Sequence, residues 1–473
     1  MRRKAFRAAM AAMLLLQACA VGPKYRRPPV TTPERFRGEE AVQPESLADL
    51  PWWQVFDDAV LQDLIATALR NNYDLQTAVA RVEQARGILV STRSPIFPQG
   101  SYSSEAGRGR VFFPGSNRTF NSFGVTLNLA WEIDLWGRIR RATEAARAQL
   151  LATNDARRGV ILTLVSGVAE TYLALLELDV QLEIARRATE TFGETLELFQ
   201  RQFEGGVGTK LAVTRGEAAL AQAAAGIPAV EQAMVATENA LSVLLGWPPT
   251  PMPRGRPLTA QRFPPRPPAG LPAEILERRP DVLQAEQTLI AANADIGVAV
   301  ADFFPRIGLT TLYGGQSTEL DLVLKSPGTV WQIAASVAGP LFQGGRLIGN
   351  YQAAKANWEA ARAQYEQTVL TALREVSDAL VAAAKLQEVR AEQARAVTAL
   401  EEASELATIR FTGGLATYFE VLEAQQQLFP AEQDLARTQR DQLLAVVELY
   451  RSLGGGWALS EETLPLDAFP GWP

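Results

Sequence analysis

The glycine-rich segment "FEGGVGTK" at 203–210 is the part of the sequence that most resembles a phosphate-binding loop. In such a loop backbone N–H groups hold the phosphate, and a lysine directly follows the last glycine. Here Thr209 separates Gly208 from Lys210, and the apolar spacing upstream predicts a helix where a strand is needed. Both features exclude a nucleotide site, so the glycines must have another role.

Glu132 and Asp134 are the pair of carboxylates most suggestive of catalysis, because residues two apart share one side of a strand. A glycosidase uses such a pair as acid and nucleophile. The surrounding segment alternates apolar and polar residues, as a strand with one polar face does. We therefore interpret both carboxylates as charges on this polar face, directed toward a pore. The chain has no histidine and one cysteine. We therefore expect no catalytic residue, no metal site and no cofactor.

The composition predicts a folded protein without a nucleic-acid partner. Of the 473 residues, 47% are hydrophobic and 21% are charged, which is typical of globular chains. The net charge of -6 leaves no basic surface for nucleic acid.

The N-terminus has the layout of an export signal at 1–18, with four basic residues followed by a short apolar run. The sequence "LQAC" ends at Cys19 and resembles the lipobox of bacterial lipoproteins, which predicts lipid attachment to this cysteine. An ordinary signal peptide cleaved after a small residue is the alternative. By the same resemblance, Ala20 favours sorting to an outer membrane. No later stretch has 18 uninterrupted apolar residues, so we expect no transmembrane helix.

The chain contains an internal duplication. The segments 71–98 and 278–305 align without a gap at an offset of 207 residues, and Phe97-Pro98 matches Phe304-Pro305. Beyond residue 137 the offset becomes 208, so that "RQFEGGVGTK" matches "IRFTGGLATY". A pattern of this kind at a fixed offset indicates two copies of one structural unit.

The duplication explains the glycines. The second copy keeps the glycine pair and the threonine but has Tyr418 in place of Lys210, so phosphate binding is not their common role. Glycine readily adopts the positive φ of a tight turn. We predict helical hairpin tips at 204–210 and 412–418. The tip residues are Gly205, Gly206, Gly208 and Thr209 in the first copy, and Gly413, Gly414 and Thr417 in the second.

A long helix precedes each tip. Residues 137–204 contain no proline, and their apolar positions recur at heptad-like spacing from Val165 to Phe203. A helix of this length would measure about 100 Å. Shorter helices are expected at 72–97 and 209–246. A coiled-coil scaffold is the plain alternative for the helices alone.

Alternating segments between the helices predict strands at about 100–113, 120–135, 306–315 and 331–341. Every second residue from 123 to 135 is apolar, which gives the strand one apolar face. Such strands are typical of outer-membrane barrels, whereas a soluble sandwich has more and shorter strands. Four strands cannot close a barrel. Copies of the chain must therefore share one, with 12 strands from three chains or eight from two.

These patterns divide the chain into six parts: a signal peptide (1–18), an acylated extended segment (19–56), a first repeat (57–246), a proline-rich linker (247–272), a second repeat (273–454) and a short tail (455–473).

The second tip differs from the first in the residues that follow it. Phe419 and Glu423 stand where the first copy has Leu211 and Arg215. If symmetry brings the tips to an axis, Phe419 would form an apolar constriction, and Glu423, with Glu420, a charged ring of a gate. The alternative is that Phe419 packs between helices and Glu423 is solvated.

The start "VGPKYRRP", both repeats and the segment "RFTGGLATYFEVLEAQQQLFPAE" at 410–432 resemble the TolC-like outer membrane efflux factors. The closest resemblance is to their acylated branch, the NodT-type or OprM-like lipoproteins. It implies a mainly α fold with a transmembrane β-barrel portion. In a homotrimer, four strands per chain would form a 12-stranded barrel, and long coiled hairpins a periplasmic α-barrel. The lipid-anchored protein would lie in the outer membrane of a Gram-negative bacterium and span the periplasm.

The resemblance also implies a function that is not enzymatic. The protein would be the exit duct of a tripartite efflux system, passively conducting drugs or other toxic compounds. Its partners would be an RND-type inner-membrane pump and a periplasmic adaptor, with the glycine tips as docking turns. Phe419 and Glu423 match constricting positions, although relatives commonly carry the shorter Asp at the latter. The alternatives are the exit duct of a type I protein secretion system and a non-conducting structural lipoprotein that spans the periplasm.

Overall fold

The computed structural model describes most of the chain from residue 20 onward. The described residues are 20–38, 47, 50, 55, 57–113, 116–262 and 272–455. The expected signal peptide, Cys19 and most of the tail lie outside them.

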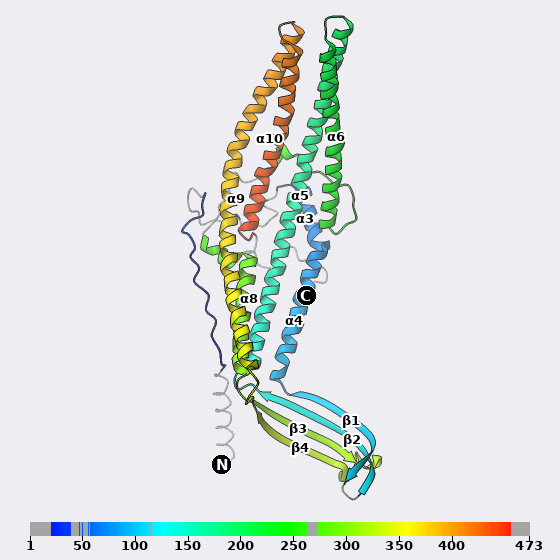
Figure 1. The fold of residues 1–473 in the computed structure, drawn as a ribbon, viewed down its shortest axis with the longest axis vertical. Helices are drawn as coiled ribbons and strands as arrows, with labels where there is room; N and C mark the ends of the chain where they lie inside the picture. The colour runs from blue at the N-terminus through cyan, green and yellow to red at the C-terminus, as the bar shows by residue number, and fades with distance from the viewer. Residues whose placement is uncertain are drawn as a thin grey trace. The chain divides into compact units, whose positions relative to one another are not determined.

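The two copies have the same order of elements: helix, two strands, a long helix and a shorter helix (Figure 1). In the first copy these are α4 (Tyr73–Arg93), β1 (Gln99–Phe113), β2 (Ser116–Ile133), α5 (Arg138–Glu204) and α6 (Lys210–Leu244). In the second they are α8 (Pro280–Ala301), β3 (Arg306–Ser317), β4 (Thr329–Ala338), α9 (Arg346–Thr412) and α10 (Tyr418–Ser452). The helices α3 (Ala59–Asn71) and α7 (Ile275–Arg278) precede them.

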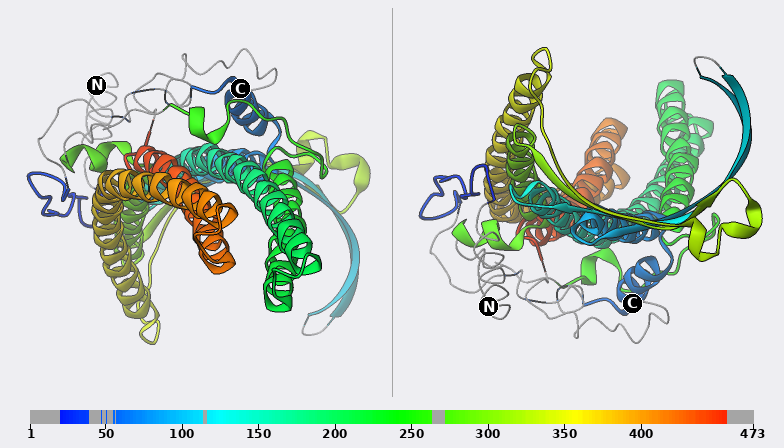
Figure 2. Two further views of the ribbon diagram at one scale, coloured as in Figure 1. Left: turned by 90° about the horizontal axis from the view of Figure 1, so that it is seen from above. Right: turned by 90° about the horizontal axis from the view of Figure 1, so that it is seen from below.

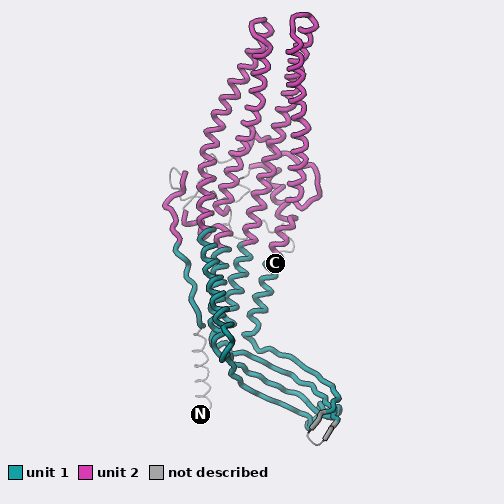
Figure 3. Tube along the Cα trace, in the orientation of Figure 1, with its two compact units in different colours: residues 1–29, 80–155, 284–367 teal, residues 30–79, 156–283, 368–473 magenta. Residues whose placement is uncertain are grey.

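The chain forms two compact units, and each unit contains parts of both copies (Figure 3). The first unit comprises residues 1–29, 80–155 and 284–367, and the second comprises 30–79, 156–283 and 368–473. The long helices α5 and α9 contribute to both units. The boundaries of the two compact units therefore differ from the boundaries of the two repeats.

The first unit contains one antiparallel sheet with the strand order β1-β2-β3-β4. Figure 2 shows that the sheet is curved. The central pair joins the two copies, with Leu127 of β2 facing Tyr313 of β3. Among the described strands, β1 and β4 each pair with one neighbour, so each presents an edge of free backbone groups.

The two faces of the sheet differ as the alternation predicts. Leu127, Trp331 and Ile333 are 60%, 72% and 73% exposed. Gly124 and Thr126, on the opposite face, are buried. One face therefore presents large apolar side chains that the described part of the chain leaves exposed, which suits a nonaqueous surrounding.

The N-terminal residues 21–27 form hydrogen bonds and an ion pair with the rest of the first unit. Val21 donates its N–H to the carbonyl oxygen of Trp136 at 3.0 Å, at the junction between β2 and α5. Arg27 makes a bidentate contact with the buried Glu286 of α8 at 2.7 and 2.6 Å, and Tyr25 donates to the same carboxylate. Burial, and then the nearby Glu286 carboxylate, raise the pKa of Tyr25, so its hydroxyl stays a donor.

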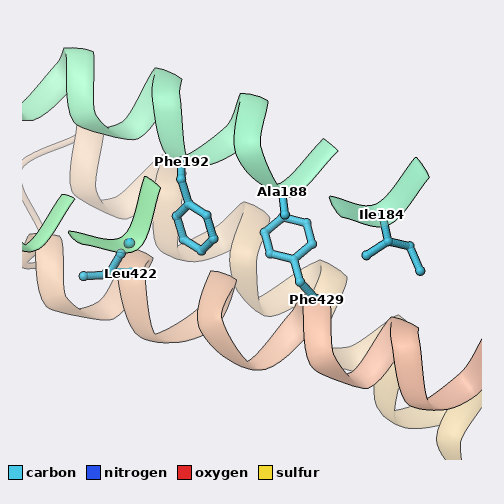
Figure 4. Close-up of a cluster of buried hydrophobic side chains, with 6 residues drawn as sticks. Ile184, Ala188, Phe192, Leu422 and Phe429 are labelled. Atoms are coloured by element: carbon cyan, nitrogen blue, oxygen red, sulfur yellow. The ribbon is translucent and has the colours of Figure 1, made fainter. Parts of the chain in front are cut away.

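The long helices pack along the predicted seam in the second unit. Phe192 of α5 meets Phe429 of α10 edge to face at 5.5 Å, beside Leu422 (Figure 4). The prediction is wrong for Phe203, which is 43% exposed and has the Lys210 ammonium 5.9 Å from its ring centroid. The confirmed buried members include Val165, Ala169, Tyr172, Leu176, Phe192 and Phe199.

One window within α5 is long and apolar enough to cross a membrane by composition, with a mean hydropathy of 1.8. In the structure 56% of that window is buried. Its hydrophobicity is thus largely used for packing inside the protein, as in the core helix of a soluble fold.

A buried carboxylate joins α3, α5 and the linker in the second unit. Asp58 is 2% exposed and caps α3 by accepting from the Val60 N–H at 2.9 Å. It also accepts from the Tyr172 hydroxyl (3.2 Å), the Arg256 N–H (3.1 Å) and the Gln261 amide (2.7 Å). Burial alone would raise the pKa of Asp58, but these hydrogen bonds hold it below its usual value.

The linker approaches this carboxylate closely at Gly255. A Cβ at this position would lie 2.3 Å from the Asp58 carboxylate, so only glycine fits. The Gly255 N–H donates to the Tyr172 hydroxyl at 2.8 Å. The linker is therefore bound to the helices by specific hydrogen bonds.

We expect Asp58→Asn to destabilise the protein by about 2 kcal/mol at neutral pH, because a charged acceptor of several hydrogen bonds is lost. Thermal unfolding of the detergent-solubilised protein measures this. Asp57→Asn is the matched control: Asp57 makes an ion pair with Arg256, but its side chain is 60% exposed, so the loss should stay below about 1 kcal/mol.

The same pair of variants gives a pH test. The lowered pKa of Asp58 makes its contribution complete above the pKa of an unfolded aspartate. The contribution disappears as the pH falls through the folded-state pKa. The wild type and Asp58→Asn should therefore converge in acid, and a constant difference at all pH values would contradict this explanation.

Candidate functional site

The first hairpin tip is a tight glycine turn. α5 ends at Glu204, and Gly206 adopts a φ of +77°. The N–H groups of Val207 and Gly208 both donate to the carbonyl oxygen of Gln202, at 3.0 and 2.8 Å. Thr209 then caps α6, since its hydroxyl accepts from the Ala212 N–H at 3.2 Å. The glycines and the threonine thus serve backbone geometry.

The second tip has the same construction, and α10 begins with a capping box. Gly414 has a φ of +74°, and the N–H that follows it, at Leu415, donates to the Arg410 carbonyl oxygen at 2.8 Å. Thr417 and Glu420 form a capping box at the start of α10, in which the Thr417 N–H donates to the Glu420 carboxylate. Glu420 therefore has a structural role that its candidate place in a gate did not include.

An aromatic cluster joins the two hairpins near their tips. Phe199 of α5 is 1% exposed and contacts Phe411 and Tyr418 edge to face, with ring centroids 5.8 and 5.5 Å apart. Ala212 and Val213 of α6 complete this cluster. Tyr418 stands where the first copy has Lys210, and its ring packs against Phe199 of the first hairpin. The sequence comparison showed the difference but not its cause.

The gate candidates lie on exposed helix surface after the second tip. Phe419 is 50% exposed, and the Arg215 guanidinium of α6 lies 5.8 Å from its ring centroid. Glu423 is exposed and accepts a 3.4 Å hydrogen bond from Gln427. Arg215 is the first-copy counterpart of Glu423, and its contact with Phe419 was not predicted. The two tips are thus joined by a cation–π contact as well as by packing.

Glu132 lies on β2 as predicted, but the placement of Asp134 on the same strand is wrong. Asp134 lies beyond the end of β2 and accepts from the backbone N–H groups of Ile139 and Arg140 at 3.0 and 2.9 Å, so it caps α5. Glu132 makes a bidentate ion pair with Arg138. Both carboxylates are engaged in the turn from strand to helix, which the alternating pattern could not reveal.

Within the described ranges, no group of three or more His, Cys, Asp and Glu side chains could hold a metal ion. The charged run at 401–410 is a solvated helix face, with Glu401, Glu402, Glu405 and Arg410 all exposed.

Paired helical hairpins, joined to a sheet with one uncovered apolar face, are the features of an outer-membrane channel subunit. The outer membrane efflux protein model matches residues 64–247 and again 271–455, one match for each copy. The chain belongs to this family. It is an outer-membrane efflux channel, and the family's role is transport rather than catalysis.

Individual comparisons agree over nearly the whole chain. The solvent efflux pump outer membrane protein SrpC of Pseudomonas putida is 33% identical over 96% of this chain and 98% of its own. The antibiotic efflux pump outer membrane protein ArpC of the same species is 33% identical, covering 94% of each chain. The outer-membrane channel OprN superposes with a TM-score of 0.87 at 31% identity, over 93% of this chain and 100% of its own.

The tip geometry predicts opposite effects of two glycine substitutions. Gly206→Ala should cost about 1 kcal/mol of local stability, because its positive φ disfavours a Cβ although nothing lies within 4 Å. Amide hydrogen exchange at 202–212 should become faster. Gly226→Ala, inside α6, would place its Cβ in ordinary contact with Ala185 and should slow exchange there. Equal effects at both sites would contradict the strained-turn interpretation.

Proposed function

We propose that three copies of this chain form the exit duct of a tripartite efflux system that passively conducts solvents and antibiotics. The observation that carries the proposal is the four-stranded sheet, which has an exposed apolar face and two free edges. Free edges are not stable in hydrocarbon, so the sheet must close with strands of other copies. The names of SrpC and ArpC support the cargo class.

The native mass of the detergent-extracted protein tests this assembly. Three chains are expected, because three sheets supply the 12 strands of a water-filled barrel. A monomer would leave the sheet unclosed and overturn the proposal. Conductance across a planar bilayer then separates a duct from a structural lipoprotein, which would not conduct.

The proposed partners at the tips are a periplasmic adaptor and, through it, an RND-type pump. Gly205, Gly206, Gly208 and Thr209, with Gly413, Gly414 and Thr417, would present the docking turns. Val207 and Leu415 are 83% and 76% exposed at these turns, which supports an apolar contact with the adaptor.

Phe419 and Glu423 would constrict the duct where the tips of three chains approach one axis. The half-exposed ring of Phe419 supports this role, because a residue that served only internal packing would be covered. Arg215 would hold the ring in place through its cation–π contact. Glu420 would contribute mainly through its cap.

We expect Phe419→Ala to raise the conductance of the purified channel, because the apolar constriction widens. Glu423→Gln should weaken the preference for cations by removing one charge per chain. Single-channel recording measures both effects. Leu211→Ala is the matched control, since Leu211 is the exposed first-copy counterpart of Phe419. An equal rise in that control would remove Phe419 from the gate.

Lipid attachment at Cys19 is supported by the path of the residues that follow it. A Cβ on Gly137 would lie 2.8 Å from the Ala20 Cα. The Val21 N–H donates a hydrogen bond to the Trp136 carbonyl oxygen, between the end of β2 and the start of α5. If the sheet lies in the membrane, this junction is at its boundary. An acyl chain on Cys19 would then reach lipid directly.

Intact mass spectrometry of the mature protein should show a chain beginning at residue 19 with acyl groups. Cys19→Ser should abolish acylation. A mature wild-type protein with an unmodified Cys19 would show that the ordinary signal peptide is the correct alternative.

A further inference from the structure

The apolar face of the sheet has a limited length along β2. Its members on this strand are Phe123, Val125, Leu127, Leu129, Trp131 and Ile133. At about 3.3 Å per residue this row is about 33 Å long, which gives a height of about 23 Å at a strand tilt of 45°. That height is close to the apolar band of about 25 Å that an outer-membrane barrel presents to lipid. The row therefore marks the two limits of the hydrocarbon on this sheet.

Two cations follow directly beyond the end of this row that is remote from α5. In the β1–β2 register Arg108 faces Asn121 and Arg110 faces Thr119. Arg108 comes two residues after Ala106, which faces the last apolar residue of the β2 row. Facing residues of antiparallel strands lie on the same side of the sheet. The outward face thus changes from apolar to cationic within one step of the register.

The position of the two arginines suits the headgroup level of a membrane. Side chains alternate along a strand, so Arg108 and Arg110 share the face of Tyr102, which is 80% exposed. Both arginines are exposed, and neither has an ion-pair or hydrogen-bond partner among the described residues. An arginine on a lipid-facing surface is costly at the bilayer midplane and tolerated near the headgroups. An acceptor for both guanidinium groups must therefore come from the surroundings.

The connection between β3 and β4, residues 318–328, adds exposed apolar residues at the same level. The β2–β3 pairing ends at Ser317, opposite the last apolar residue of the β2 row, so the connection begins there. Val323 is 5% exposed, whereas Leu320 and Leu324 are 69% and 88% exposed. Cations at the same level as exposed leucines fit an amphiphilic ligand with an anionic head and hydrocarbon chains.

We propose that Arg108 and Arg110 bind the phosphate groups of a phosphorylated lipid in the outer leaflet of the outer membrane. A guanidinium group forms paired hydrogen bonds with phosphate oxygens, and its apolar stem can extend along the sheet to the headgroups. Leu320 and Leu324 would contact acyl chains, so a lipid suits this surface better than free phosphate. The inference rests on the proposed position of the sheet in the membrane, and it adds a ligand to that of the duct.

Thermal unfolding of the detergent-solubilised protein with added lipid A, a glycolipid with two phosphates, tests the site. A ligand that binds the folded state raises the Tm. Lipid A should raise the Tm of the wild type more than the same lipid after removal of its phosphates. Inorganic phosphate at the same concentration should have no effect. An equal rise with inorganic phosphate would show that the site takes a free anion, and this would overturn the lipid proposal.

Arg108→Gln with Arg110→Gln should abolish the difference between the two forms of the lipid. The control, Arg395→Gln with Arg437→Gln, removes the same charge from α9 and α10, where each arginine makes an exposed ion pair within its helix. The control should keep the wild-type difference. An unchanged difference in the first variant, or an equal loss in both variants, would overturn the proposal.

A conservative variant keeps the test decisive where the glutamine variant folds poorly. Arg108→Lys with Arg110→Lys retains both charges but cannot form the paired hydrogen bonds of a guanidinium group. It should show a smaller difference between the two forms of the lipid than the wild type. A difference equal to that of the wild type would contradict specific recognition of phosphate by the arginines.

The native mass of the same samples separates this inference from the proposed duct. An oligomer that binds both forms of the lipid equally would overturn the lipid site and leave the duct intact. A monomer that still prefers the phosphorylated form would overturn the assembly and leave the lipid site intact.

Discussion

The free edges of the four-stranded sheet are the constraint on which the rest of this structure depends. In hydrocarbon a backbone N–H or C=O group without a partner costs several kcal/mol. The sheet has the apolar outer face of a membrane-embedded structure, yet β1 and β4 each pair on one side only. Closure by further copies answers this constraint. At the end of β2, Asp134 caps the start of α5 through the backbone N–H groups of Ile139 and Arg140.

The duplication repeats one set of contacts within the chain. The β2–β3 register joins the two copies, and the two hairpins share the same internal register. The copies differ where they meet near the tips. There Tyr418 packs on Phe199 and Arg215 contacts the half-exposed ring of Phe419. These differences are the means by which two similar hairpins form one asymmetric pair.

Several carboxylates form structural hydrogen bonds that hold segments of the chain together. Asp58 joins a helix cap, Tyr172 and the linker, and Glu286 holds Tyr25 and Arg27 of the N-terminal segment. Asp134 caps α5. These hydrogen bonds hold the linker and the N-terminal segment against the helices.

The sequence by itself determined the duplication, the helical and strand segments and the turn role of the glycines, because each rests on local periodicity or on a fixed offset. It also determined the family, through the motif at 410–432. Only the tertiary structure decided that Phe203 is exposed and that Arg215 contacts Phe419. These outcomes depend on which helix ends where and on which side chains from distant segments meet. Neither a period nor a repeat offset carries that information.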